Sequence, residues 1–379
     1  MELSNKIHRR AFLGSTLAAL PAMTQTGRRR SSSDVFRVGC LNVVDYSHLN
    51  DIWAPYINPR AGKKDVPFTG MRITHCWEID RTKAEEFAKV YGCQVVKNFD
   101  DMVGKVDCII NGGYYNYPWN HILHQPYLEA GLPNLINRPF ANSLAKAQKM
   151  IETARKYRAT ILVPSAFEYN DPIARAKAWA SGKKIICYNA TNSTDDYATH
   201  GVHGVYMICW VVADAGNPVV SVAYQAKSWW NLPGLLTFEH RDKDGRQFFG
   251  SLHLVSDFLG TMQIYTTEER GGQIYQKKSF AIQAGTGFPF DKTELWAPTI
   301  WVFENMAMNG DMPQTFEQIY QKTNVFLAGF KSILENDGKP VKLEEVPEEW
   351  ASPVELPDRP GDPTVSLFKK KFGSATRNP

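Results

Sequence analysis

Six of the nine histidines stand where a folded chain could bring several of them into one crevice. By pattern, each lies near a strand end or early in a helix, and two pairs are three residues apart, which places each pair on one helical face. Imidazole binds transition metals, and a carboxylate such as Glu168, Asp195 or Asp196 could complete a metal set. The six are His48, His75, His121, His124, His200 and His203. No spacing among them equals an established zinc motif, so we predict no metal site.

A second chemical signal is the segment RVGCLNVVDYSHLNDIW, which has the strand–loop–helix order of a dinucleotide site. The spacing G-x-G-x-x-G falls on Asn42 to Ser47, and every glycine is replaced. Asn42 tolerates the left-handed conformation and Ser47 could cap the helix. Val44 should obstruct the approach of the pyrophosphate, and Asp45 adds a negative charge nearby. The loop therefore predicts either an unusual nucleotide site or one that has been lost.

Two further strand ends could complete such a site. Glu78 follows the second predicted strand, where a carboxylate holds the ribose hydroxyls of NAD and repels the extra phosphate of NADP. A helix-dipole role for Glu78 is the alternative. Asn111 and Gly112 end the fourth predicted strand, as an open loop over a cofactor requires. The expected cofactor contacts for NAD, preferred over NADP, are Asn42, Val44, Ser47, Glu78, Asn111 and Gly112.

The elements that must position these residues fall into two groups. From residue 34 to 165, short apolar strands alternate with helices, which predicts a parallel sheet covered on both faces. From 166 to 345, strands are linked by Gly, Asn and Asp turns, and two helices follow. We therefore expect an N-terminal Rossmann-like α/β domain, then an α+β domain with an open, mostly antiparallel sheet. A proline-rich tail, residues 346–379, either wraps around the protein or hangs free.

This order of domains resembles the Gfo/Idh/MocA oxidoreductases over nearly the whole chain after residue 33. The most specific stretch is 108–157, where a helix ends in Ala-Gly and a strand and a turn follow. Residues 309–345 resemble the C-terminal helix and closing strand of the family. The resemblance implies an oxidoreductase that acts on a sugar, polyol or glycoside with NAD or NADP, and it implies a homo-oligomer.

The resemblance also implies catalytic positions. The family's Glu-Lys-Pro turn is here Asn137-Arg138-Pro139, and Arg138 keeps the charge but cannot shuttle a proton. His203 matches the family's catalytic histidine, a base for a sugar hydroxyl, whereas Thr199 stands where a carboxylate is usual. The catalytic candidates are His203, Arg138 and the additional His200, and Arg138 also counts as a cofactor contact. The alternatives are a lyase, epimerase or glycosidase, or a carbohydrate-binding protein with a degenerate nucleotide site.

Aromatic residues are frequent, with 10 Trp, 16 Tyr and 20 Phe, which suits sugar stacking or plain core packing. The run GGYYNYPW follows a predicted strand end and should lie beside the crevice, where a lid or a dimer surface is the alternative. The candidates for stacking on a sugar ring are Tyr114, Tyr115, Tyr117, Trp119, Trp229 and Trp230.

Composition and the chain ends set the remaining expectations. The net charge of +4 is concentrated near the ends, so no basic stripe for nucleic acid remains. None of the six cysteines forms a C-x-x-C pair, which predicts buried free thiols. Residues 1–33 predict an export signal and linker, and Arg9-Arg10-x-Phe-Leu resembles a twin-arginine signal. We therefore expect a periplasmic or secreted protein without permanent membrane insertion.

Overall fold

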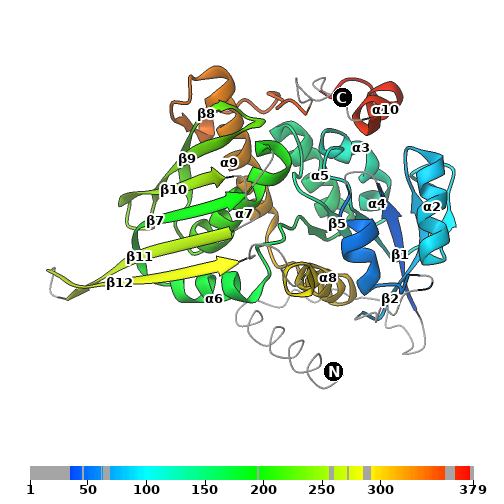
Figure 1. Cartoon of the computed structure of the whole chain (residues 1–379), viewed down its shortest axis with the longest axis horizontal. Coiled ribbons are helices and arrows are strands. Elements are labelled where there is room, and N and C mark those ends of the chain that lie inside the picture. The colour runs from blue at the N-terminus through cyan, green and yellow to red at the C-terminus, as the bar shows by residue number, and fades with distance from the viewer. Residues whose placement is uncertain are drawn as a thin grey trace.

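The structure is a computed structural model. It describes residues 35–375 except 45–46, 61, 63–68, 194–195, 256–259, 271–272, 285–291 and 355–362. The predicted export signal and Asp45 lie outside the described residues. Two sheets lie at opposite ends of the molecule with helices between them, and helix α8 (Lys292–Asn309) crosses the space between the two domains (Figure 1).

The N-terminal sheet has six parallel strands in the order β3-β2-β1-β4-β5-β6, which confirms the Rossmann-like domain. The strands are β1 (Phe36–Leu41), β2 (Met71–Trp77), β3 (Gln94–Val95), β4 (Cys108–Asn111), β5 (Asn134–Ile136) and β6 (Ile161–Leu162). The strand order reverses between β1 and β4. Ligands of such sheets bind at the carboxyl ends of the strands at this point, so the crevice begins at Leu41 and Asn111.

Local signals in the sequence fix two helices of this domain. The Asp80 side chain accepts a hydrogen bond from Thr82 N at the start of α2 (Arg81–Tyr91), and Gly92 ends that helix at a φ of 67°. Ser143 caps α5 (Leu144–Tyr157) in the same way. The shorter helices are η3 (Tyr117–Trp119), α3 (Asn120–Leu123) and α4 (Gln125–Glu129).

The helix expected after β1 is absent as an α-helix, which corrects the prediction. The chain forms a π-turn, η1 (Leu49–Trp53), and then a 3₁₀ turn, η2 (Ala54–Tyr56). Pro55 lacks an N–H group, so the α-helical hydrogen bond at that position cannot form. Ser47 is not the cap residue of η1. Its hydroxyl donates to Asn42 O at 2.6 Å and accepts from Leu49 N at 3.0 Å, so it closes the loop upon itself.

The second sheet has seven strands in the order β12-β11-β7-β10-β9-β8-β13. Its strands are β7 (Lys184–Ser193), β8 (Val219–Ser228), β9 (Asn231–Arg241), β10 (Gln247–Val255), β11 (Gly260–Arg270), β12 (Gln273–Ala284) and β13 (Val341–Lys342). Only the β7–β10 pair is parallel, so the sheet is mostly antiparallel, as expected.

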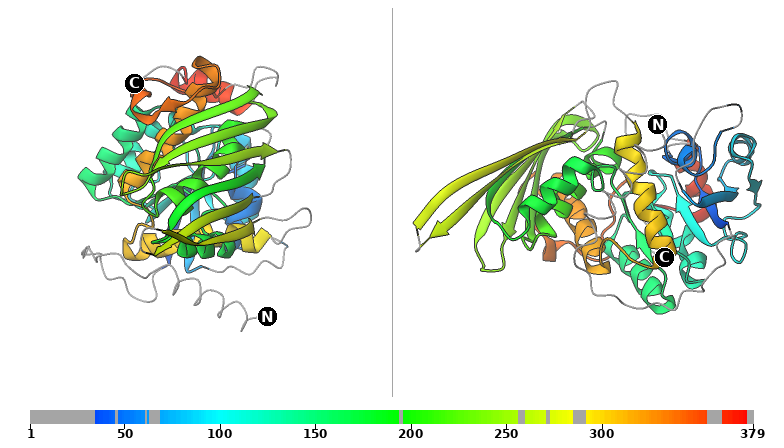
Figure 2. Two further views of the ribbon diagram at one scale, coloured as in Figure 1. Left: turned by 90° about the vertical axis from the view of Figure 1, so that its left-hand side faces the viewer. Right: turned by 90° about the horizontal axis from the view of Figure 1, so that it is seen from below.

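Helices cover the face of this sheet that is turned toward the Rossmann domain (Figure 2). They are α6 (Asp171–Ala180), the run η4 (Tyr197–Gly201), α7 (Val202–Ile208) and η5 (Cys209–Ala213), and α9 (Phe316–Glu335). A 3₁₀ turn, η6 (Leu343–Glu345), follows β13. No helix of the described chain is long and apolar enough to cross a membrane. All six cysteines are free thiols, and four of them are buried.

The tail wraps around the Rossmann domain rather than hanging free. Helix α10 (Pro363–Phe372) places the ring of Phe368 at 5.3 Å from that of Trp119 and at 6.3 Å from that of Trp77. Beyond the helix, Ala375 O accepts a hydrogen bond from the Lys146 ammonium at 3.1 Å. The apolar face near the end of β2 is therefore covered by the far end of the chain.

Candidate active site

The turn after β5 carries a buried cation into the space between the domains. Arg138 is only 1% exposed, and its Nε donates to His203 Nε2 at 3.0 Å. Its Nη1 donates to Asn137 Oδ1 at 3.4 Å, and its guanidinium lies 4.9 Å from the centre of the Tyr114 ring. Desolvation by burial lowers the pKa of Arg138 to about 10, although nearby Tyr114 and Asp196 act in the opposite direction. The guanidinium is still charged at neutral pH.

His203, on α7, has no exposed surface, and both of its ring nitrogens have partners. Nδ1 lies 2.7 Å from Ser165 Oγ, while Nε2 accepts from Arg138. Burial, followed by the charge of Arg138, lowers the pKa of His203 well below its ordinary value. The ring is therefore neutral. Because Nε2 accepts a hydrogen bond, Nδ1 carries the proton and donates to Ser165.

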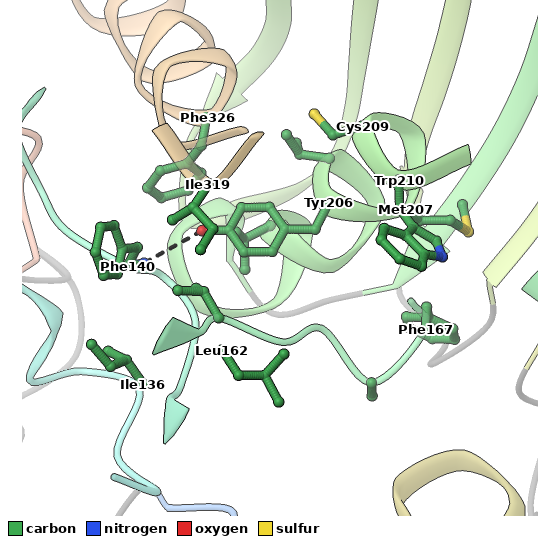
Figure 3. Packing of buried hydrophobic residues seen from close by; sticks show 14 of the residues in the cluster. Ile136, Phe140, Leu162, Phe167, Tyr206, Met207, Cys209, Trp210, Ile319 and Phe326 are labelled. Atoms are coloured by element: carbon green, nitrogen blue, oxygen red, sulfur yellow. Dashed lines mark hydrogen bonds between the residues drawn. The ribbon is translucent and has the colours of Figure 1, made fainter. Parts of the chain in front are cut away.

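A hydrogen bond fixes the arginine turn against the helix of His203. Phe140 N donates to the hydroxyl of Tyr206 at 3.3 Å, and Tyr206 lies one helical turn after His203 (Figure 3). Apolar side chains from β5, β6, α7 and α9 surround this bond (Figure 3). The two domains thus supply one half each of the Arg138–His203 pair.

A buried ion pair holds the loop that carries Ser165. Glu168 Oε2 accepts from Ser165 N at 2.6 Å, and Glu168 Oε1 lies 3.0 Å from Lys322 Nζ on α9. Neither charged side chain is exposed. Burial raises the pKa of Glu168, while the charge of Lys322 opposes the shift. The contact partner of His203 is therefore anchored by a residue more than 100 positions further along the chain.

A carboxylate close to the site comes from Asp196, for which the sequence suggests only a role as a metal ligand. Asp196 accepts from Thr199 N at 2.6 Å, from Thr199 Oγ at 2.7 Å and from the Tyr115 hydroxyl at 3.3 Å, and it lies 3.5 Å from His200 Nδ1. Burial alone raises its pKa, but the bonds and charge of His200 and Thr199 leave the pKa lowered overall. Asp196 thus supplies, three residues earlier, the carboxylate that is missing at Thr199. His200 contacts Asp196 rather than His203.

A third histidine closes the site from the Rossmann side. The His48 ring is nearly parallel to that of His203, with 6.4 Å between the ring centres. The ring centre of Trp296 on α8 lies 4.6 Å from that of His48, and the ring centre of Trp53 lies 5.1 Å from it. Within the described chain, His48 Nδ1 is buried without a hydrogen-bond partner. Burial, then the charges of Arg138 and His200, lower the pKa of His48 well below its ordinary value, so this ring is neutral too.

The loop after β1 has kept its backbone shape without its glycines. Asn42 has a φ of 52°, the left-handed conformation that its type allows. Glu78 Oε2 accepts from Val43 N at 2.7 Å and from Val44 N at 3.4 Å, and Oε1 accepts from Ile79 N at 2.8 Å. The side chain of Val44 is half-buried and packs against the hydrophobic core. Glu78 is therefore tied to the loop as well as to the end of β2.

The residues at the end of β4 are packed tightly under the same loop. A Cβ added to Gly112 would lie 2.3 Å from Ser47 Oγ, so only glycine fits there. Asn111 Oδ1 accepts from Asn42 Nδ2 at 2.9 Å, and Asn111 Nδ2 lies 3.0 Å from His124 Nε2. Asn111 thus joins the first and fourth strands through its side chain, and this network uses His124.

Two oxygens at these strand ends still require donors. Asn42 Oδ1 and Asn116 Oδ1 are buried and have no hydrogen-bond partner in the described part of the chain. A Cβ on Gly113 would lie 2.2 Å from Asn116 Oδ1 and 2.8 Å from Asn42 Cβ, so the two asparagines face the same glycine. Together with Glu78, they offer acceptors for hydroxyl groups. These residues fit the ribose of a dinucleotide, although the amides of Val43 and Val44 are already engaged by Glu78.

The remaining candidates are dispersed. His75 contacts Thr74 at 2.9 Å, and in the residues that the structure describes no group of three His, Cys, Asp or Glu side chains could hold a metal. The expected aromatic platform is wrong in part, because Tyr117 donates to Pro353 O and Trp119 to Gly373 O in the tail. Trp229 packs on Phe330 in the second domain. Tyr114 is the aromatic residue of the predicted group that contacts Arg138.

Residues 52–165 match the family GFO_IDH_MocA, described as an oxidoreductase family with an NAD-binding Rossmann fold. The Rossmann domain belongs to the Gfo/Idh/MocA family. Comparison with curated proteins gives no match. The expected fold class is confirmed by solved structures that share the fold over most of this chain.

One such structure is a myo-inositol dehydrogenase from Lactobacillus casei in complex with NAD(H) and myo-inositol, with a TM-score of 0.63, 12% identity, and coverage of 82% of this chain and 97% of that one. A probable dehydrogenase from Thermotoga maritima has a TM-score of 0.62 at 13% identity, with 82% and 100% covered. GenD2 of gentamicin A biosynthesis, in complex with NAD, has a TM-score of 0.61 at 12% identity, with 84% and 99% covered. At these identities the likeness concerns the fold alone.

Proposed function

We propose that this chain is a nicotinamide-dependent oxidoreductase that acts on a sugar, polyol or glycoside. The observation that carries the proposal is the Arg138–His203 pair, which lies between the carboxyl ends of the Rossmann strands and the second sheet. A histidine beside a fixed cation suits removal of a hydroxyl proton while negative charge develops on the substrate oxygen. Structural relatives solved with NAD(H) and with inositols support this class of reaction.

NAD is the proposed cofactor, with NADP less favoured. Glu78, Asn42 and Asn116 supply acceptors for ribose hydroxyl groups, and the Glu78 carboxylate would repel a phosphate on the same ribose. When bound, the nicotinamide supplies the acceptor or donor of a hydride. Gly112 allows the loop that carries Ser47 and Leu49 to pack directly on the end of β4.

In this proposal His203 accepts the substrate proton at Nε2. The hydrogen bond from Nδ1–H to Ser165 Oγ then stabilises the charged imidazolium. The resting structure prevents that step, because Arg138 Nε–H occupies Nε2. The substrate must therefore attract the guanidinium before His203 can act as a base. The positive charge of Arg138 then favours the negative charge that develops on the nearby substrate, and Asp196 with His200 lies close by.

The direct test combines binding with turnover. Purified protein is titrated with NAD and NADP by calorimetry, and inositols, aldoses and their glycosides are screened for formation of NADH by its absorbance. We expect NAD to bind more tightly than NADP and at least one polyol to be oxidised. Absence of both binding and oxidation would reject the redox proposal.

A second candidate function is supported by the loop itself. The amides of Val43 and Val44, which a pyrophosphate would need, bond to Glu78. A chain that has lost its nucleotide would be a non-redox enzyme or a carbohydrate-binding protein on the same scaffold. The titration separates the two, since this candidate expects sugar binding without NAD binding.

The location of the protein and its oligomeric state are also proposals. Arg9 and Arg10 with the apolar run that follows support export by a twin-arginine signal, and hence a periplasmic or secreted location. The homo-oligomer that the family resemblance implies is likewise proposed. Fractionation of cells and light scattering of the purified protein test these two points.

A further inference from the structure

Arg138 is a buried cation whose partners are all neutral. Its contacts are the unprotonated Nε2 of His203, the amide oxygen of Asn137 and the ring of Tyr114. No carboxylate of the described residues lies within 4.0 Å of its guanidinium. By contrast, the buried Lys322 is paired with Glu168. The buried Lys146 also lacks a paired carboxylate, but its ammonium donates to three oxygens, Pro118 O, Asn142 Oδ1 and Ala375 O. Among the described residues, Arg138 therefore has no paired anion to balance its positive charge.

Among the described residues, the acid whose charge acts on Arg138 is already engaged by other groups. Asp196 is saturated by two bonds from Thr199, one from Tyr115 and the contact with His200. A buried ion without a counter-charge destabilises the fold, so such groups are usually paired or bind a ligand. The pattern is that of a site whose anion arrives from outside the protein.

The geometry of the arginine restricts what that anion is. Arg138 Nη2 donates to no described group, while Nε is held only by His203. Nε–H and Nη2–H point in parallel from one edge of the guanidinium and match the two oxygens of a carboxylate. A single hydroxyl oxygen would use one donor, and the compact lysine typical of the related turn would serve it equally well.

We propose that the substrate of this site carries a carboxylate, as a sugar acid does, and that the carboxylate binds the Nε–Nη2 edge of Arg138. This step deepens the proposed function and rests on it for the reaction, but not for binding. Binding at that edge withdraws Nε–H from His203 and leaves Nε2 able to accept a proton from a substrate hydroxyl. The acid group of the substrate thus selects the ligand and also prepares the base. Neutral His48, with its unpartnered Nδ1, faces the same space and suits a second hydroxyl.

The experiment compares matched acids and neutral sugars without NAD, so that a failure of redox chemistry does not affect it. The probes are D-glucuronate with D-glucose, D-galacturonate with D-galactose, and D-gluconate with D-glucitol, at equal ionic strength. The readouts are the Tm and calorimetric affinity of the wild-type protein and of Arg138→Lys and Arg138→Met. Arg175→Met, an exposed arginine on α6, is the control variant.

We expect at least one acid to raise the Tm of the wild-type and control proteins more than its neutral partner does. Arg138→Met should bind that acid at least about 30-fold more weakly, as expected when one side of a buried charge pair is removed, and Arg138→Lys should fall between. In buffer alone, Arg138→Met should have a higher Tm than wild type, because an uncompensated buried charge has been removed. The proposal would be overturned if, in all three pairs, the acid and the neutral sugar changed the Tm equally. A lower Tm of Arg138→Met than of wild type in buffer alone would also overturn it.

Discussion

Arg138 and His203 restrain each other in the resting site. The arginine Nε–H occupies the lone pair that a base would use, and burial with that neighbouring charge lowers the pKa of the histidine well below its ordinary value. A sequence comparison suggests both residues, but it cannot show that they are bonded to each other. At the scale of single residues, the activity of the site therefore depends on what separates this pair.

Replacing His203 with Ala should lower kcat by about 10²–10⁴, the usual contribution of a positioned general base. NAD affinity should be unchanged, because the proposed ribose contacts lie at Asn42 and Glu78. Steady-state kinetics with calorimetry measures both quantities, and His75→Ala, on β2, is the matched control. An equal loss of turnover and cofactor affinity would instead make His203 a structural residue.

Restoring glycine at Val44 should tighten NAD binding, because the branched side chain stands where the backbone normally approaches the pyrophosphate. The same change removes half-buried apolar contact, so the free energy of unfolding should fall by about 1 kcal/mol. Titration calorimetry and denaturant unfolding measure the two effects. Unchanged or weaker NAD affinity would show that this loop does not contact a pyrophosphate.

At the scale of elements, helix α9 supports the site from behind. Lys322 reaches Glu168 and Val163 O, and Glu168 in turn fixes Ser165, the partner of His203. Helix α8 adds Trp296 over His48 and reaches the Rossmann domain, where Glu304 accepts from Gly70 N. These contacts link elements that are distant in sequence. The orientation of His203 therefore depends on three helices, α7, α8 and α9.

Removing either member of the Lys322–Glu168 pair should destabilise the fold by about 3–5 kcal/mol, because the other charge is left buried. Lys322→Met with Glu168→Gln together should cost less than the sum of the single changes. Denaturant unfolding of the three variants provides the double-mutant cycle. Lys331→Met, in an exposed pair on the same helix, is the control. Additive losses would contradict a direct pair.

At the scale of the whole molecule, buried histidines occur in both domains. Burial lowers the pKa of His124 in the Rossmann domain and of His240 in the second sheet to about 4 in each case. His48 and His203 are lowered as well.

Stability should therefore fall as the pH is lowered from about 7 toward 4. Below about 6.5 the unfolded chain binds protons at these histidines and the native chain does not, which costs about 1.4 kcal/mol per pH unit for each group. Unfolding measured from neutral to acidic pH should show this slope, and His240→Phe should make it shallower by one group. A stability that does not change over this range would show that these histidines are not neutral in the folded protein.

The sequence by itself determined the class of fold. The alternation of apolar strands with capped helices predicts the parallel sheet, and the turn residues after 166 predict the second sheet, because both signals are local. It also indicated Asn42, Glu78 and Gly112 at strand ends. It misjudged the helix after β1, where Pro55 interrupts the bonding, and the aromatic run, whose Tyr117 and Trp119 pack against the tail.

Only the tertiary structure decided how the site works. Arg138 and His203 are 65 residues apart, and Lys322 lies 154 residues from Glu168, so their contacts depend on how the two domains pack together. The role of Asp196 beside Thr199, and the burial of a guanidinium among neutral partners, follow from that packing as well. Local sequence pattern determines the helices and strands. The charge balance of a buried site depends instead on residues distant in sequence, which only the folded chain brings close together.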